Sequence, residues 1–149
     1  MRVRLASQSD VAAIVPLLGQ LGYPVTEEEL AHRFARVAGS AVDPAWVAID
    51  GADSAVVGFA SGHLAYVYEL ERPVAELTAL VVDERHRRSG AGQAFVETFE
   101  QWVIEADCVR WSVATAFHRV DAHAFYERLG YTQLARKYQK NREAVETES

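Results

Sequence analysis

The order of three segments near the middle of the chain constrains the fold most strongly. Pro73 opens a predicted strand, Val74–Val82, whose nearly continuous Leu and Val content after Ala79 is typical of a strand buried on both faces of a sheet. A polar loop, residues 83–89, leads from this strand into a stretch with Phe, Trp and Val at helical spacing. A buried strand that continues through a polar loop into a helix predicts an α/β domain.

Similar patterns divide the rest of the chain. Apolar or alternating runs bounded by turn residues predict further strands over residues 2–6, 46–49, 55–70, 109–116 and 131–139. Two helices are expected after capping boxes, Ser7 with Asp10 and Thr26 with Glu29. A last helix is expected over residues 120–129. Two helices therefore follow the first strand, and the remaining strands come after them.

Length and composition limit the class of protein. The 149 residues suit one domain, which we expect over residues 1–140, followed by a frayed acidic tail over 141–149. The single cysteine, Cys108, excludes an internal disulfide and a thiolate zinc cluster, and favours a reducing cytoplasm. The net charge of −6 argues against nucleic-acid or membrane partners. No apolar run reaches the roughly 18 residues of a membrane span.

The densest functional signal is the loop formed by residues 87–92, Arg-Arg-Ser-Gly-Ala-Gly. Its glycines let the backbone approach a ligand, and the free N–H groups at the start of the next helix attract an anion. Together with Arg85 the loop brings three cations together, which favours phosphate binding over a solvated basic turn. No Lys followed by Ser or Thr closes a Walker loop, and Phe95 replaces the third glycine of a dinucleotide fingerprint.

Two blocks of the sequence resemble the GNAT family of N-acetyltransferases. The strand end Leu80, Val81, Val82, followed by the loop at residues 87–92, is similar to the acetyl-CoA loop of that family. A later block is similar to the family's helix with an aromatic pair, which ends at a glycine before an aromatic strand: Arg119, Ala122, His123, Phe125, Tyr126, Gly130 and Tyr131. The order of the predicted elements agrees with the same family over about residues 1–140.

The resemblance implies both a fold and a co-substrate. The fold is α/β, a mixed, mostly antiparallel central sheet flanked by helices, with splayed fourth and fifth strands. The co-substrate is acetyl-CoA, which passes its acetyl group directly to an amine without a metal. The expected cofactor-binding residues are Leu80, Val81, Val82, Arg87, Arg88, Ser89, Gly90, Ala91, Gly92 and Arg119. The family often has Asn where this chain has Arg119, and many of its members form homodimers.

Two further residues are candidates for the chemistry. Glu76 lies at the spacing before Gly90 where some family members hold a catalytic glutamate, and a carboxylate can remove a proton from the attacking amine. The alternative is a structural carboxylate paired with a cation such as Arg119 or His63. Tyr126 resembles the tyrosine that protonates the leaving thiolate, although its helical spacing also suits simple core packing.

The acceptor is less constrained than the co-substrate. Glu69, Glu71 and Glu76 near the expected cleft favour a small cationic amine, such as a polyamine, an aminoglycoside or an amino-acid derivative. A protein lysine or N-terminus is the first alternative. A non-catalytic sensor that binds acyl-CoA is the second.

The remaining polar candidates suggest no other chemistry. His118 and His123 are five residues apart, so they do not share a helical face, and with His86 they form no recognised metal spacing. Cys108 precedes an apolar strand and is more typical of buried packing than of a nucleophile. The aromatic residues that can belong either to the core or to the acceptor site are Trp46, Tyr66, Tyr68 and Trp111.

Overall fold

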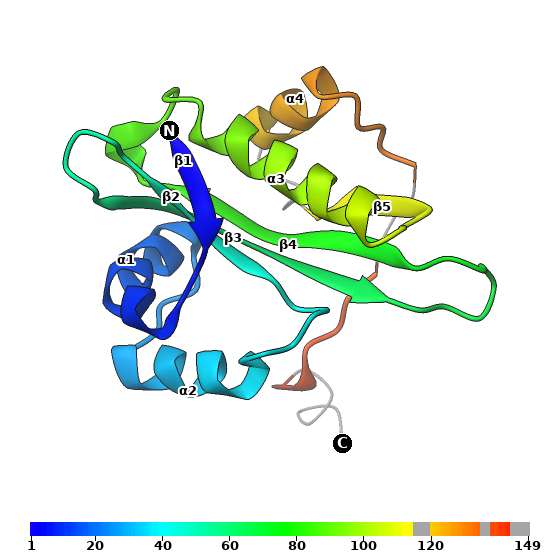
Figure 1. Ribbon diagram of the computed structural model, residues 1–149, viewed down its shortest axis with the longest axis horizontal. Helices are drawn as coiled ribbons and strands as arrows, with labels where there is room; N and C mark the ends of the chain where they lie inside the picture. The colour runs from blue at the N-terminus through cyan, green and yellow to red at the C-terminus, as the bar shows by residue number, and fades with distance from the viewer. Residues whose placement is uncertain (115–119, 135–137, 144–149) are drawn as a thin grey trace. The chain divides into compact units, whose positions relative to one another are not determined.

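A mixed five-stranded sheet is the frame of the first part of the chain (Figure 1). The computed structural model describes residues 1–114, 120–134 and 138–143, which fall into two units, Met1–Ala114 and Thr115–Ser149. The strands of the first unit, in spatial order, are β1 (Arg2–Leu5), β2 (Ala45–Ile49), β3 (Val56–Ala65), β4 (Val74–Val82) and β5 (Arg110–Val113). Neighbours are antiparallel except β4 and β5, which are parallel. The predicted mixed, mostly antiparallel sheet is confirmed.

Helices cover both faces of this sheet. On one face lie α1 (Val11–Leu21) and α2 (Glu27–Val37), and on the other lies α3 (Ala91–Glu105) (Figure 1). Two short 3-10 turns, η1 (Gln8–Asp10) and η2 (Glu84–His86), precede α1 and α3. The core on the α1 side combines apolar side chains of helices and strands: Val11, Ile14, Leu17, Leu30, Val47, Ile49, Phe59 and Val81.

Aromatic side chains fill the space between α3 and the sheet. Trp46 of β2 meets Phe99 and Trp102 edge-on, with ring centroids 6.5 and 5.9 Å apart. Trp46 therefore belongs to the core, the first of the two roles that its sequence position left open. Gly58 of β3 lies so close to α3 that a Cβ added there would stand 2.8 Å from a ring carbon of Phe95.

The two predicted capping boxes are present, but they begin different kinds of helix. The Thr26 hydroxyl accepts from the Glu29 N–H at 3.1 Å, and the Glu29 carboxylate accepts from the Thr26 N–H at 3.0 Å, so α2 begins where expected. The box formed by Ser7 and Asp10 caps the 3-10 turn η1, and α1 begins only after it, at Val11.

The strand β4 is paired unequally on its two sides. Against β3 it pairs from end to end, with a register shift between Ser61 and Gly62. Against β5 it pairs only over four positions, from Val74 with Arg110 to Leu77 with Val113. Among the described strands, residues 79–82 of β4 have β3 as their sole partner. Residues 115–119, which follow β5 in the sequence, lie outside the described part of the chain, so the expected splay between the fourth and fifth strands stays a prediction.

Three strand predictions need correction. β3 ends at Ala65 and the chain continues as a loop, so the expected strand over residues 55–70 is too long. β5 is limited to Arg110–Val113, shorter than residues 109–116, two of which lie outside the described part. The strand over residues 131–139 is wrong where the chain is described, at 131–134 and 138–139. A strand needs a neighbour's backbone groups, and no described segment pairs with this one.

The second unit contains one described α-helix, α4 (Val120–Arg128). Gly130 follows it with a left-handed φ of 93°, a conformation that a residue without a Cβ adopts readily. Three aromatic side chains pack edge-on in this unit: the ring centroids of Phe125 and Tyr126 are 5.1 Å apart, and those of Tyr126 and Tyr131 are 5.9 Å apart. The helix predicted over residues 120–129 is confirmed, and it ends one residue earlier than expected.

Replacing Asp10 tests the ion pair that ties β1 to the start of α1. Arg4 donates to both oxygens of this buried carboxylate, at 2.8 and 2.9 Å, and the Ser7 N–H donates to it at 2.8 Å. We expect Asp10→Asn to lower the free energy of unfolding by about 2 kcal/mol. The exposed ion pair of Arg72 with Asp107 is the control, and Asp107→Asn should cost less than about 0.5 kcal/mol.

The same ion pair makes stability depend on acid. The Arg4 hydrogen bonds are the main reason that the pKa of Asp10 lies below its ordinary value. Its stabilisation is therefore complete at neutral pH and is lost as the pH falls below about 4, through the lowered pKa of the folded state. Urea unfolding at pH 7 and pH 3 should show the difference between native protein and Asp10→Asn shrinking in acid. An unchanged difference would contradict this account.

Gly58→Ala tests the close packing of α3. The new Cβ would also lie 3.1 Å from the Val81 carbonyl oxygen, so strand and helix must move apart, at about 1–3 kcal/mol. Gly19→Ala is the matched control, because nothing lies within 4 Å of its Cβ position and the residue is inside α1. We expect that control to gain about 0.5–1 kcal/mol. Thermal unfolding of the two variants measures both effects, and equal shifts would refute the packing argument.

Candidate active site

The predicted phosphate loop lies between η2 and α3 and is open to solvent. The side chains of Arg87, Arg88 and Ser89 are exposed. Arg88 and Gly90 both have left-handed backbones, with φ of 66° and 89°, and Gly90 caps α3 without a side chain. The first N–H groups of α3 have no partner within the helix, since its ladder begins with the Ala94 N–H on the Gly90 carbonyl. This arrangement can bind an anionic group.

Asp83 holds the start of this loop in place. Its carboxylate accepts from the backbone and side chain of Arg85, at 3.2 and 3.1 Å, and from the Gln20 amide at 3.4 Å. The Gln20 carbonyl in turn accepts from the Glu84 N–H at 3.0 Å. The Arg85 side chain is the main reason that the pKa of Asp83 is lowered. Arg85 is thus paired with Asp83, whereas Arg87 and Arg88 have no hydrogen bond or ion pair within the described residues.

His86 also lies at the base of the loop. Its Nε2 is 3.5 Å from an Asp50 carboxylate oxygen, and its Nδ1 is 3.9 Å from Asp83. The buried Nδ1 makes no hydrogen bond in the structure. His86 therefore packs between the β2–β3 turn and the phosphate loop.

Leu80, Val81 and Val82 form the last part of β4, beyond the point where β5 leaves it. Val81 is buried in the core on the α1 side. Among the described strands, residues 79–82 pair only with β3.

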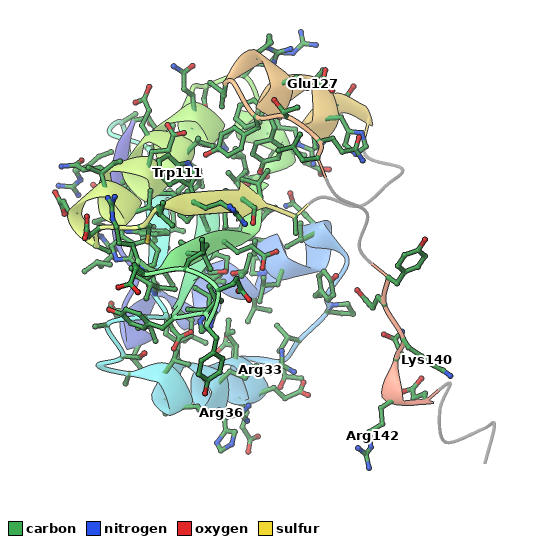
Figure 2. The ribbon with its side chains drawn as sticks, turned by 90° about the vertical axis from the view of Figure 1, so that its right-hand side faces the viewer. Arg33, Arg36, Trp111, Glu127, Lys140 and Arg142 are labelled. Carbon is green, nitrogen blue, oxygen red and sulfur yellow. The ribbon has the colours of Figure 1, made fainter. Side chains whose placement is uncertain are left out.

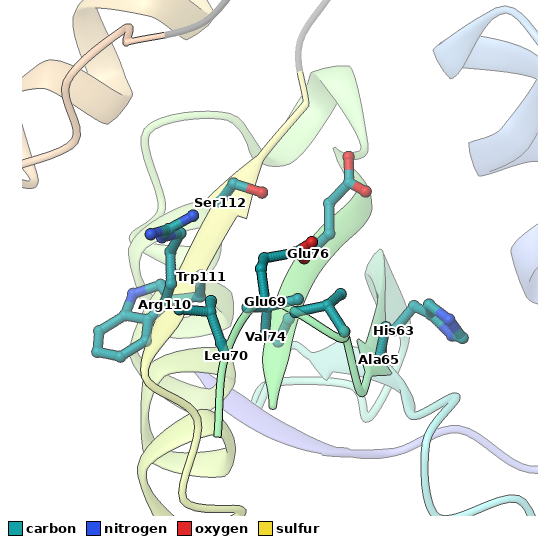
Figure 3. A pocket seen from close by; sticks show the side chains of 11 residues that line it. His63, Ala65, Glu69, Leu70, Val74, Glu76, Arg110, Trp111 and Ser112 are labelled. Carbon is teal, nitrogen blue, oxygen red and sulfur yellow. The ribbon is translucent and has the colours of Figure 1, made fainter. Parts of the chain in front are cut away.

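Glu76 lines a pocket of about 230 Å³ formed by β3, β4, β5 and the loop between β3 and β4 (Figure 3). Its register partners are His63 on β3 and Ser112 on β5, so the three residues form a row on one face of the sheet. The Glu76 carboxylate is partly exposed and has no hydrogen bond or ion pair with another described residue. Glu69, Arg110 and Trp111 line the same pocket, whereas Glu71 does not.

A second pocket, of about 310 Å³, lies between α2 and the sheet. Apolar side chains of α2, Leu30, Phe34 and Val37, form one wall, with Arg33 beside them. Figure 2 shows Arg33 and Arg36 on this helix. His63 lines both pockets, and the sequence treated it only as one conceivable partner of Glu76. The sequence did not indicate the hydrogen bond between His63 and Asp43, because the two residues are twenty positions apart.

Tyr126 belongs to the second unit and Glu76 to the first. The phenol is buried, and this burial raises its pKa to about 12. It therefore stays protonated at neutral pH and can donate a hydrogen bond. Arg119 lies outside the described residues, as does His118.

The remaining candidates are the single cysteine and two tyrosines. Cys108 is buried, which raises the pKa of its thiol, as does the nearby Asp107. Tyr66 and Tyr68 are exposed in the loop after β3.

The described residues contain no group of three or more His, Cys, Asp or Glu side chains that could hold a metal ion. Nor does this part of the chain contain a helix that is long and apolar enough to cross a membrane.

Solved structures share this fold at low sequence identity. A protein from Agrobacterium tumefaciens is 23% identical, with a TM-score of 0.85 over 95% of this chain and 100% of that chain. An aminoglycoside 6'-N-acetyltransferase from Acinetobacter haemolyticus is 20% identical, with a TM-score of 0.78 over 95% and 98%. A glucosamine-6-phosphate N-acetyltransferase from Arabidopsis thaliana is 21% identical, with a TM-score of 0.81 over 95% and 97%. These likenesses show the fold alone.

The sequence itself matches one family. Among curated proteins no match is found. Residues 17–131, however, match the acetyltransferase (GNAT) family, and that range includes β4, the basic loop, α3 and α4. Because the match covers more than half of the chain, the protein belongs to the acetyltransferase (GNAT) family.

Proposed function

We propose that the chain is an acetyl-CoA-dependent N-acetyltransferase that moves an acetyl group directly to the primary amine of a small cationic molecule. One strand carries the main observation: β4 presents Glu76 in a pocket, then an edge that no described strand pairs with, and then leads into the basic loop before α3. Family membership supports the same reaction. We further propose a cytoplasmic enzyme that forms homodimers, as the family resemblance implies.

The binding of acetyl-CoA is supported by two features on either side of residue 82. The pyrophosphate is anionic and suits the exposed Arg87 and Arg88 together with the free N–H groups of Ala91 and Gly92. The pantetheine arm is an extended amide chain, which can hydrogen-bond to the free edge of Leu80–Val82 as an added strand would. Ser89 and Gly90 complete the loop, since neither places a large side chain at the helix start.

Glu76 and Tyr126 are proposed for the proton transfers. A partly exposed carboxylate that lines a pocket and has no partner among the described residues is available to accept a proton from an amine, directly or through a water. A phenol with a pKa near 12 keeps its proton at neutral pH and suits a donor to the leaving sulfur. Acetyl-CoA supplies the activated thioester, Glu76 would accept a proton from the amine, and Tyr126 would donate one to the leaving sulfur.

The acceptor class follows from the charges of the pocket. Glu69 and Glu76 both line it, against one guanidinium, that of Arg110. Two carboxylates attract an ammonium group more strongly than a neutral or anionic one. We therefore favour a polyamine, an aminoglycoside or an amino-acid derivative over a protein lysine or N-terminus. Release of CoA thiol across a panel of these amines, with a protein-only blank, identifies the class.

Arg88→Gly separates ligand binding from folding. Glycine tolerates the left-handed backbone at this position, so we expect the thermal unfolding midpoint to change little. The loss of an exposed cation should weaken CoA binding about tenfold, measured by titration calorimetry. Arg36→Gln on α2, whose side chain lines neither pocket, should leave the affinity unchanged. Equal affinities of Arg88→Gly and native protein would argue against a phosphate role for this loop.

Glu76→Gln tests the base. We expect kcat to fall by about 10²-fold or more, because the amide cannot accept the proton, while the affinity for CoA stays the same. Glu69→Gln is the matched control: it lines the same pocket and should mainly raise KM for the cationic amine. If both variants change only KM, Glu76 attracts the substrate and is not the base.

A further inference from the structure

A histidine with a defined orientation lies where the two pockets meet. The Nδ1 of His63 is 2.7 Å from one oxygen of Asp43, and the other Asp43 oxygen accepts from the Ser40 hydroxyl at 2.8 Å. The Ser40 bond and then the His63 bond lower the pKa of Asp43, so this group is a carboxylate at neutral pH and can only accept. A neutral His63 must therefore carry its proton on Nδ1, which leaves a lone pair on Nε2.

The Nε2 atom is available for chemistry. It makes no hydrogen bond with a described residue, and the side chain is 51% exposed. Figure 3 shows the His63 ring on the opposite side of the pocket from Arg110 and Trp111, with Glu76 between them. One pocket thus contains two proton acceptors that make no hydrogen bond with another described residue, the Glu76 carboxylate and Nε2 of the oriented His63.

The reaction requires the amine nitrogen to lose two protons in separate steps. At neutral pH a primary amine is R–NH₃⁺, and in the amide product its nitrogen carries a single hydrogen. One proton must leave before the nitrogen lone pair can form the C–N bond, and the second leaves after that bond has formed. As the C–S bond breaks, its electron pair goes to sulfur, which takes up one proton to become a thiol. The other proton is released to solvent.

We propose that His63, oriented by Asp43, accepts the first of these protons at Nε2 and passes it to solvent, while Glu76 accepts the second. Imidazole suits the first step because its basicity lies near neutral pH and because this ring reaches bulk water. The inference rests on the proposed function and adds His63 as a catalytic residue and Asp43 as its positioning residue.

The charges around His63 favour an approaching ammonium group. Glu76 of β4, Arg110 of β5 and Glu69 of the loop between β3 and β4 line the same pocket as His63. Asp43 faces it from the segment before β2, and Arg33 from α2. Three carboxylates against two guanidinium groups leave the surroundings of Nε2 net negative.

The tautomer of His63 can be measured without any ligand. In two-bond ¹H–¹⁵N spectra of the full chain, we expect neutral His63 to be the Nδ1–H form, assigned by the signal that His63→Gln removes. Asp43→Ala should convert it to the Nε2–H form or to a mixture, because the acceptor at Nδ1 is gone. An Nε2–H tautomer in the native protein overturns the proposal.

Kinetics distinguish a proton acceptor from a structural histidine. We expect His63→Gln to lower kcat/KM at pH 7 by about 10²-fold, with normal CoA binding. The deficit should shrink as the pH approaches the pKa of the acceptor amine, since a free amine no longer needs the first transfer. An acceptor whose amine is already neutral at pH 7 should show the same recovery. A deficit that does not change with pH or acceptor refutes this role.

Two comparisons keep the outcomes apart. The exposed histidine of α2, His32, lines neither pocket, so His32→Gln should match the native protein. The Glu76→Gln deficit should persist at high pH, because the second transfer is still required. If His63→Gln is fully active and Glu76→Gln is not, the His63 role fails and the proposed function stands. If neither variant affects turnover, the proposed site is wrong.

Discussion

The short pairing between β4 and β5 is the constraint on which the site depends. Four positions pair the two strands, from Val74 with Arg110 to Leu77 with Val113. The paired part supports the pocket with Glu76, and residues 79–82 beyond it have β3 as their sole partner among the described strands. A strand that paired with residues 79–82 on the side away from β3 would satisfy their remaining backbone groups with hydrogen bonds. The proposed binding of the pantetheine arm uses these same groups.

The basic loop depends in turn on packing behind it. Ala91, Phe95 and Phe99 are buried against the sheet, so the first turn of α3 has a fixed place at the end of β4. Asp83 and Gln20 then tie the preceding turn to α1. Arg87 to Gly90, at the outer end of the loop, are exposed. Contacts on its inner side thus hold the loop in place, and such order before binding would lower the entropic cost of the proposed anion binding.

The sequence correctly predicted the features that depend on interactions between neighbouring residues. The bounds of β4 and the capping of α2 were correct because burial and capping act over a few neighbouring residues. The strand over residues 131–139 was wrong because alternation does not reveal whether a neighbouring strand exists. The pair of Asp43 and His63 was not predicted, since it depends on how the segment before β2 lies against β3. Arg85 likewise counted as a free cation until the structure paired it with Asp83.

The absence of a side chain at Gly58 has a consequence that reaches beyond the core. Phe95, whose ring would lie 2.8 Å from a Cβ at this position, is four residues after the first residue of α3, one turn from the N–H groups at the helix start. The spacing between β3 and α3 at this point therefore affects the distance between those N–H groups and the end of β4. Gly58 on β3 thus sets the spacing between the sheet and the first turns of α3, so a change at this strand position would shift the helix end that carries the proposed anion site.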